Sequence, residues 1–267
     1  MRVNEPTRWP KLAIMDWGIG GLTFFKLFKE VLPAIPVVYF SDSGERPYGK
    51  QVRSDLEKRL VNIAHFLSNH GVTMLVVACN AMSSVLSEKL RSRIPAHFDL
   101  VGVIDPTVDY LRSQKGVRRV GVVGGAYTVR SGVYRKPFIE SGIMVRQKIT
   151  QPLSALIEEG DLNSPQLCKI MASILQCLKD VDCLVLACTH YTAIAERFQA
   201  LLPGIEMVDP CKKTLNHVLQ GTIPVGGGQD LFLTTGDSIK SRAAAKKVFG
   251  LKTATFRPVV VDHVKIG

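Results

Sequence analysis

Two stretches of the chain, MLVVACNAMSS at residues 74–84 and CLVLACTHYTA at residues 183–193, follow one pattern. Each opens with an apolar run typical of a buried parallel strand, ends that run in alanine, cysteine and a polar residue, and continues into an expected helix. A second pair, LAIMDWGIGG near residue 12 and VGVVGGAYT near residue 120, is also similar. The two pairs indicate two related α/β units that face each other across a cleft.

Short β-branched runs alternate with longer amphipathic stretches along the rest of the chain. Strands are expected at residues 12–15, 37–40, 74–78, 100–103, 120–123, 183–187, 206–208 and 231–234. Helices are expected at residues 21–31, 54–69, 82–91, 107–114, 129–140, 164–179, 193–202 and 238–248. The alternation predicts an α/β fold with mainly parallel, doubly wound sheets, in which functional groups gather where strands end.

The composition excludes several classes of protein. Of the 267 residues, 46% are hydrophobic and 21% charged, as in ordinary folded proteins. No apolar run approaches the ~20 residues that cross a bilayer, so we expect no membrane partner. The opening MRVNEPTRWP lacks the apolar segment of a signal peptide and is expected to be a polar tail before the first strand. Six cysteines without a CxxC pair indicate free thiols in a reducing cytoplasm, and no metal site is expected.

The formal charge of +11 is compatible with a nucleic acid, a membrane surface or an acidic small molecule as partner. The basic residues are scattered in segments such as RSDLEKR, KGVRR and KSRAAAKK rather than gathered into a stripe. This scatter argues against nucleic-acid binding. Attraction of a small dicarboxylate is a simpler role for the positive electrostatic potential that this charge creates.

Cys79 and Cys188 are the strongest candidates for chemistry. Each is expected at the carboxyl end of a strand and near the start of a helix, where the helix dipole lowers the pKa of a thiol. A single cysteine in such a place is usually an inert buried residue, but two in matching contexts favour a working pair. The other cysteines lack this context and are expected in the core or on the surface: Cys168, Cys177, Cys183 and Cys211.

Asp16 closes the first expected strand, in the segment MDWGIGG. The glycines that follow it would let backbone amides approach a bound anion and lead into a helix. Their spacing is not the G-x-G-x-x-G pattern, so no nicotinamide cofactor is expected. The alternative role for Asp16 is that of a helix N-cap or a turn residue.

The loop SDSGERPYG at residues 41–49 contains a Pro-Tyr-Gly turn that could project Tyr48 over a pocket, although an ordinary surface loop is the alternative. His190, two residues after Cys188, is a candidate general acid or base. A cysteine and a histidine also leave thiol hydrolase chemistry open. A pair this close in sequence rarely forms the nucleophile–base contact, which argues against that alternative.

Taken together, these motifs resemble the bacterial glutamate racemases. The resemblance extends over D-x-G-x-G-G at 16–21, SDSGERPYG at 41–49, ACN at 78–80, GVIDP at 102–106, VGVVGGAYTVRSGVY at 120–134, ACTHY at 187–191 and TTGD at 234–237. It implies a cofactor-independent racemase of glutamate, without pyridoxal phosphate, in which Cys79 and Cys188 move a proton on and off the substrate α-carbon from opposite sides. It also implies a cytoplasmic homodimer that serves peptidoglycan synthesis in the cell wall.

The resemblance further implies two pseudo-symmetric domains, residues 1–98 plus 209–267 and residues 99–208, with the active site in the cleft between them. Asp16, His190 and Glu158 match positions that support proton transfer. Glu158 is ambiguous because its segment is about one residue short and Glu159 is adjacent; helix-surface charge is the alternative there. The substrate-binding positions are Trp17, Ser41, Pro47, Tyr48, Gly49, Asn80, Ala81, Thr128 and Thr189.

Three of these regions depart from the family pattern. Trp17 replaces the usual serine, and Ala81 and Gly125 replace threonines. Each lost hydrogen bond to a substrate group would cost about 1–3 kcal/mol if that group stays buried and unpaired. Trp17 either fills part of the pocket or packs outward. Aspartate, a hydantoin or a malonate therefore remains open as substrate, as does a catalytically altered ligand-binding relative.

Overall fold

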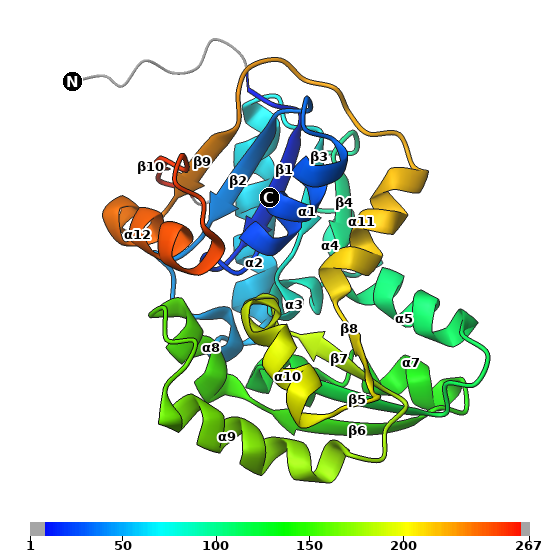
Figure 1. Ribbon diagram of the computed structural model, residues 1–267. Coiled ribbons are helices and arrows are strands. Elements are labelled where there is room, and N and C mark those ends of the chain that lie inside the picture. Colours follow the sequence, from blue (N-terminus) through cyan, green and yellow to red (C-terminus); the bar gives the residue numbers. More distant parts are fainter. Residues whose placement is uncertain (1–8, 263–267) are drawn as a thin grey trace.

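The computed structural model describes residues 9–262, so most of the expected polar tail lies outside the described residues. Within this range the strands form two sheets, and every neighbouring pair of strands is parallel. Figure 1 shows one sheet above the other, each surrounded by helices. The predicted α/β fold with two parallel sheets is confirmed.

The larger sheet has the strand order β10-β9-β2-β1-β3-β4, and the smaller has β6-β5-β7-β8. The strands of the larger sheet are β1 (Leu12–Asp16), β2 (Val37–Ser41), β3 (Met74–Val77), β4 (Asp99–Gly102), β9 (Leu231–Thr234) and β10 (Phe256–Pro258). Those of the smaller sheet are β5 (Arg119–Gly124), β6 (Met144–Ile149), β7 (Cys183–Ala187) and β8 (Glu206–Val208).

Helices follow most of the strands, as parallel pairing requires. The first half of the described chain contains α1 (Leu22–Val31), the 3₁₀ helix η1 (Tyr48–Lys50), α2 (Arg53–Asn69), α3 (Asn80–Ser83), α4 (Glu88–Arg91), α5 (Ile104–Ser113) and α6 (Ala126–Ser131). The second half contains α7 (Arg135–Glu140), α8 (Gln151–Glu158), α9 (Pro165–Leu175), η2 (Gln176–Leu178), η3 (Thr189–Ile194), α10 (Ala195–Leu201), α11 (Pro210–Gln220) and α12 (Ser238–Phe249).

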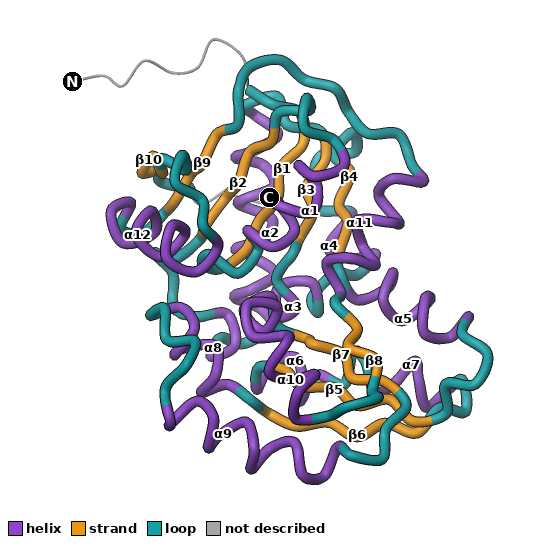
Figure 2. Tube along the Cα trace, viewed as in Figure 1, coloured by secondary structure: helices purple, strands orange, loops and turns teal. Residues whose placement is uncertain are grey.

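The central strands are apolar at nearly every position because helices cover both faces of each sheet (Figure 2). Strands β1, β3 and β7 are buried throughout. Helix α2 packs on one face of the larger sheet, and α1, α11 and α12 pack on the other. In the smaller sheet, α8, α9 and α10 cover one face while α5 and α7 cover the other. The carboxyl ends of the central strands are left free to carry polar residues. None of the described helices is long and apolar enough to cross a membrane.

Several elements differ from the sequence prediction. Strands β6 and β10 and helices α8 and α11 were not predicted. The expected helix at 129–140 is two helices, α6 and α7, because Gly132 ends the first in the left-handed conformation at φ 72°. Strand β4 pairs with β3 in the larger sheet, although the sequence assigned residues 99–102 to the second domain. Pairing with β3 keeps β4 in the first unit, and the chain crosses to the second unit only after Gly102.

Candidate active site

A cavity of about 480 Å³ lies where the carboxyl ends of the strands of both sheets meet. Its lining comes from the ends of β1, β3 and β7, from the loop after β2, and from α6 and α8. The residues are Asp16, Trp17, Pro47, Tyr48, Gly49, Lys50, Cys79, Asn80, Ala81, Gly125, Thr128, Gln151, Pro152, Ser154, Ala155, Glu158, Glu159, Ala187, Cys188, Thr189 and His190. Both candidate cysteines therefore face one cavity from different sheets.

Cys79 follows β3 and occupies the N-cap position of α3. Burial raises the pKa of the Cys79 thiol well above its ordinary value, and the negative charge of Asp16 raises it further. We expected the start of the following helix to lower this pKa. The backbone N–H of Met82, in α3, does lower it, but desolvation and the Asp16 charge outweigh that effect. The raised pKa favours the protonated form of the Cys79 thiol.

Cys188 follows β7 and leads into η3, which turns His190 back over the sulfur. The Cys188 Sγ and His190 Nδ1 atoms are 3.7 Å apart. This contact overturns the sequence-based objection to a Cys188–His190 pair, because a 3₁₀ turn brings together two residues that an extended chain would hold apart. The two residues form a thiol–imidazole pair that faces the cavity.

Glu158, from the last turn of α8, binds the other side of the His190 ring at Nε2. Burial alone would lower the pKa of His190, but its hydrogen bonds to Cys188 and Glu158 outweigh burial and raise the pKa well above the ordinary value. Glu159 lines the cavity as well, yet it is Glu158 that contacts the ring. The line Glu158–His190–Cys188 can deliver or receive a proton at the sulfur.

Asp16 is buried at the end of β1 and is bonded across the two sheets. Its Oδ2 accepts a hydrogen bond of 2.8 Å from the Thr189 hydroxyl, and its Oδ1 accepts one of 2.8 Å from the backbone N–H of Trp17. It is not the cap of the next helix, because the N-cap of α1 is Gly21 and no side chain caps it. The carboxylate instead stands beside Cys79 in the cavity.

The glycine loop after Asp16 packs directly against α8 and η3 of the second unit. A Cβ atom on Gly18 would lie 2.5 Å from the Glu158 Oε1 atom, and one on Gly20 would overlap the Thr189 side chain. The sequence had suggested that these glycines let amides approach an anion. In the structure they let the two halves of the site approach each other.

Most of the expected substrate-binding residues line the cavity. Ser41 does not: it ends β2, is fully buried, and its hydroxyl oxygen has no hydrogen-bond partner among the described residues. Tyr48 lines the cavity with its ring while its hydroxyl points away and donates to Asp42. Trp17 also lines the cavity rather than packing outward, and its indole Nε1 donates a 2.8 Å bond to the backbone oxygen of Glu45.

Sequence reasoning missed Gln151, the first residue of α8. Its side-chain oxygen accepts a 3.0 Å bond from the backbone N–H of Ala126. A Cβ atom on Gly49 or Gly125 would lie 2.8 or 2.9 Å from that oxygen. The Gln151 amide therefore occupies the space left by the two glycines.

Tyr134 is a second missed residue: its hydroxyl donates a 2.7 Å bond to Asn80 Oδ1 and so orients that side chain. Within residues 9–262 no group of three or more His, Cys, Asp and Glu residues is arranged to hold a metal ion.

These features define a class of protein: two parallel α/β units that share one cavity, with a thiol from each unit and a carboxylate or imidazole beside each thiol. The pattern of the family Asp/Glu/Hydantoin racemase matches residues 13–218, and the chain belongs to this family. It is an amino-acid racemase family member.

Its relatives include the glutamate racemase of Aquifex aeolicus, 32% identical over 226 residues that cover 84% of this chain and 88% of the relative. A glutamate racemase of Thermus thermophilus is 32% identical over 260 residues, covering 95% of this chain and 97% of the relative.

Solved structures of glutamate racemases have the same fold as this chain. Glutamate racemase from Thermus thermophilus, in complex with β-chloro-D-alanine, matches with a TM-score of 0.84 at 30% identity and covers 96% of this chain and 98% of that one. Glutamate racemase from Francisella tularensis, in complex with D-glutamate, matches with a TM-score of 0.83 at 23% identity, covering 95% and 98%.

Proposed function

We propose that this protein racemises glutamate by proton transfer between Cys79 and Cys188, without a cofactor. One observation carries the proposal: the two thiols line a single cavity from two different sheets, and each has its own acid–base neighbour. Asp16 stands beside Cys79, and the Glu158–His190 pair stands beside Cys188.

The α-proton of an amino acid is very weakly acidic, so a base on one face and an acid on the other must be aligned with the same carbon. One sulfur, as thiolate, takes the α-proton while the thiol on the opposite face donates its proton to the same carbon. The C–H bond breaks on one face and a new one forms on the other, which inverts the centre. The two sulfurs then exchange roles for the other enantiomer.

The substrate carboxylate gains negative charge as the α-proton leaves. Asn80 is suited to hold it, since it follows a strand end, lines the cavity and carries a side-chain amide that can donate, whereas the Thr189 hydroxyl already donates its one hydrogen to Asp16. Asn80 is itself oriented by Tyr134. Lys50, at the exposed rim, and the net charge of +11 favour an anionic substrate.

We rank glutamate first among the candidate substrates because the relatives that match most of this chain are glutamate racemases. Aspartate is the second candidate, favoured by a specific observation. The Trp17 ring lines the cavity, and Ala81 has no hydroxyl to offer. A bulky ring in the cavity suits the shorter of the two acidic side chains. The homodimer, the cytoplasmic location and the role in peptidoglycan synthesis stay predictions.

The test is a chiral chromatography assay of the purified protein with the D and L forms of glutamate and aspartate, a hydantoin and a malonate as further substrates, and a Cys79→Ser/Cys188→Ser double variant as control. We expect glutamate to approach a racemic mixture from either enantiomer and the double variant to leave it unchanged. Racemisation of aspartate alone would reassign the substrate. Binding of an acidic amino acid with no inversion would contradict the proposal and favour a ligand-binding role.

A further inference from the structure

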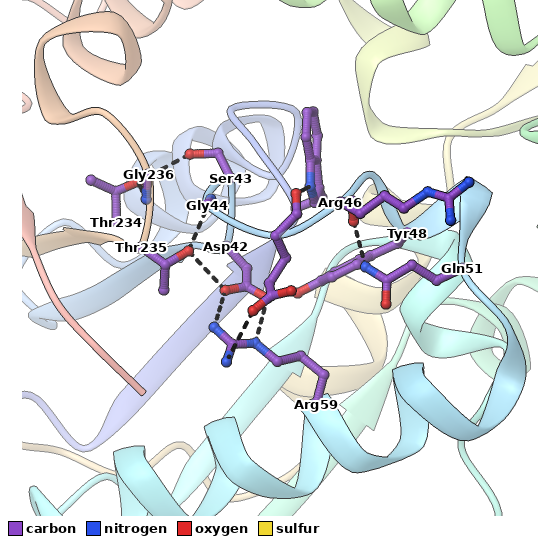
Figure 3. A network of polar contacts seen from close by, with 12 residues as sticks. Asp42, Ser43, Gly44, Arg46, Tyr48, Gln51, Arg59, Thr234, Thr235 and Gly236 are labelled. Carbon is purple, nitrogen blue, oxygen red and sulfur yellow. Dashed lines mark hydrogen bonds and ion pairs between the residues drawn. The ribbon is translucent and has the colours of Figure 1, made fainter. Parts of the chain in front are cut away.

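Arg59, in the middle of α2, does not line the cavity but contacts the loop after β2 that supplies part of its lining (Figure 3). Its side chain is 10% exposed and forms a two-pronged bond with Asp42: Nη2 donates to Oδ1 at 2.6 Å and Nε donates to Oδ2 at 2.9 Å. Its third nitrogen, Nη1, lies 3.4 Å from the Glu45 carboxylate. One guanidinium therefore holds two acidic residues of the loop that follows β2.

Asp42 connects Arg59 to the cavity wall. Its carboxylate is fully buried, and its Oδ2 accepts a 2.5 Å hydrogen bond from the Tyr48 hydroxyl. Its Oδ1 accepts a 2.9 Å bond from the Thr235 hydroxyl, which in turn accepts the Gly44 backbone N–H at 3.0 Å. Burial first and the Asp42 charge second raise the pKa of Tyr48, so its hydroxyl stays a donor. Asp42 accepts hydrogen bonds from both the Tyr48 hydroxyl and the Arg59 guanidinium, and so holds the Tyr48 ring in the wall.

Glu45 makes the second connection. Its backbone oxygen accepts the indole N–H of Trp17 at 2.8 Å while its side chain reaches Arg59. Tyr48 and Trp17 both line the cavity, whereas Asp42 and Arg59 do not. The two aromatic residues of this wall are thus connected to the Arg59 guanidinium, one through the buried Asp42 carboxylate and the other through Glu45, whose side chain is 43% exposed.

Removing this cation has a predictable consequence. Asp42 would stay buried with its charge uncompensated, which is strongly unfavourable. The loop would relieve this by moving toward water, and Tyr48 and Trp17 would move with it. A lysine at position 59 keeps the charge but lacks the planar fork, so it holds one carboxylate rather than two.

We propose that Arg59 is a positioning residue that sets the shape of the cavity wall formed by Tyr48 and Trp17, acting on Tyr48 through Asp42 and on Trp17 through Glu45. The wall it fixes selects among acidic amino acids by side-chain length. The selectivity rests on the proposed racemase function, whereas the positioning of Tyr48 and Trp17 by Arg59 does not.

The chain offers a reporter that is independent of activity. Its two tryptophans are Trp9 and Trp17, and Trp9 packs against Phe66 and His70. In a Trp9→Phe background, the fluorescence of Trp17 alone reports on the wall. Arg59→Met is expected to shift its emission to longer wavelength and to increase quenching by acrylamide, with Arg59→Lys between Arg59→Met and wild type.

Lys29→Met is the matched control. Lys29 forms a 3.0 Å ion pair with Asp230 in the same unit, and neither residue lines the cavity. It is expected to lower stability without moving the Trp17 signal. If Arg59→Met fails to fold, Thr235→Val, which removes one hydroxyl partner of Asp42, tests the same link and is expected to give a smaller shift in the same direction.

The kinetic arm compares glutamate with aspartate. Arg59→Met is expected to raise KM more than it lowers kcat and to reduce kcat/KM about 10- to 100-fold for the preferred substrate. The ratio of the kcat/KM values for glutamate and aspartate is expected to move toward one. An unchanged Trp17 signal and an unchanged preference, with stability lowered as in Lys29→Met, would overturn the proposal. If the wild type racemises neither amino acid, the proposed function fails, and the fluorescence arm alone decides the role of Arg59.

Discussion

The Thr189 hydroxyl and the Asp16 carboxylate form a 2.8 Å hydrogen bond between residues 173 positions apart. Asp16 ends a strand of the larger sheet, and Thr189 follows a strand of the smaller one. The bond joins the half of the site that holds Cys79 to the half that holds Cys188. Both partners are buried, so the bond fixes the relative position of the two thiols.

Thr189→Val is therefore expected to lower both the stability and the activity. The change leaves Asp16 Oδ2 without its donor, which costs about 1–3 kcal/mol of unfolding free energy. Activity is expected to fall by roughly 10- to 100-fold because the carboxylate beside Cys79 loses its orientation. Thr23→Val is the control: it removes a 2.6 Å bond to Thr192 between the same two units, outside the cavity. Thermal unfolding and racemisation assays should separate the two variants; equal loss of activity in both would refute the assignment.

Gly18→Ala is expected to disable the Cys188 side of the site. The added methyl group would lie 2.5 Å and 2.8 Å from the two carboxylate oxygens of Glu158, so the end of this side chain must shift from its position against His190. We expect kcat to fall by at least about tenfold. Gly221→Ala, where the nearest atom is a backbone oxygen at 3.6 Å, should leave kcat unchanged. Steady-state kinetics on both variants is the measurement, and wild-type kcat in Gly18→Ala would show that Glu158 is dispensable.

Glu158→Gln should change the pH dependence of stability. The folded-state pKa of His190 is raised above its ordinary value of 6.5, so its protonation stabilises the fold fully below that value. This contribution is lost as the pH rises through the raised pKa. Because Glu158 is one cause of the increase, the variant should lose the contribution at lower pH. Melting temperatures measured from mildly acidic to alkaline pH test this, and parallel curves for the two proteins would contradict it.

The Cys79 thiol should react slowly with iodoacetamide, because the thiolate is the reactive form and both burial and the Asp16 charge raise its pKa. Asp16→Asn removes the second cause and should speed the reaction. Exposed Cys168 serves as the internal reference in peptide mass spectrometry. Equal Cys79 rates in the wild type and the variant would mean that Asp16 does not act on this thiol.

The sequence predicted the fold where strands are buried on both faces. The run CLVLA matches β7 at both ends because every residue in it is buried. Strand β6, MVRQKI, was missed because it lies at a sheet edge and is half exposed, so it carries polar residues. Strand β10 is three residues long and includes a proline, which argues against a strand.

The site followed the same rule. The sequence placed Cys79, Cys188 and Asp16 together because each stands at or just after the end of a buried strand, and such ends meet at one edge of a parallel sheet; all three line the cavity. Gln151 was missed because its helix was missed. Arg59 carried no signal, since an arginine on an amphipathic helix ordinarily faces water. The bond from Arg59 to Asp42 is a tertiary contact that no local pattern encodes.

The central claim is that each sulfur handles the proton on one face of the substrate α-carbon. Its most direct test is NMR of glutamate in D₂O with the wild type, Cys79→Ser and Cys188→Ser. We predict that the wild type incorporates deuterium at the α-carbon from either enantiomer, and that each single variant loses racemisation by about 10²- to 10⁴-fold, the usual contribution of a general acid or base. Racemisation at the wild-type rate in either variant would contradict the two-thiol mechanism.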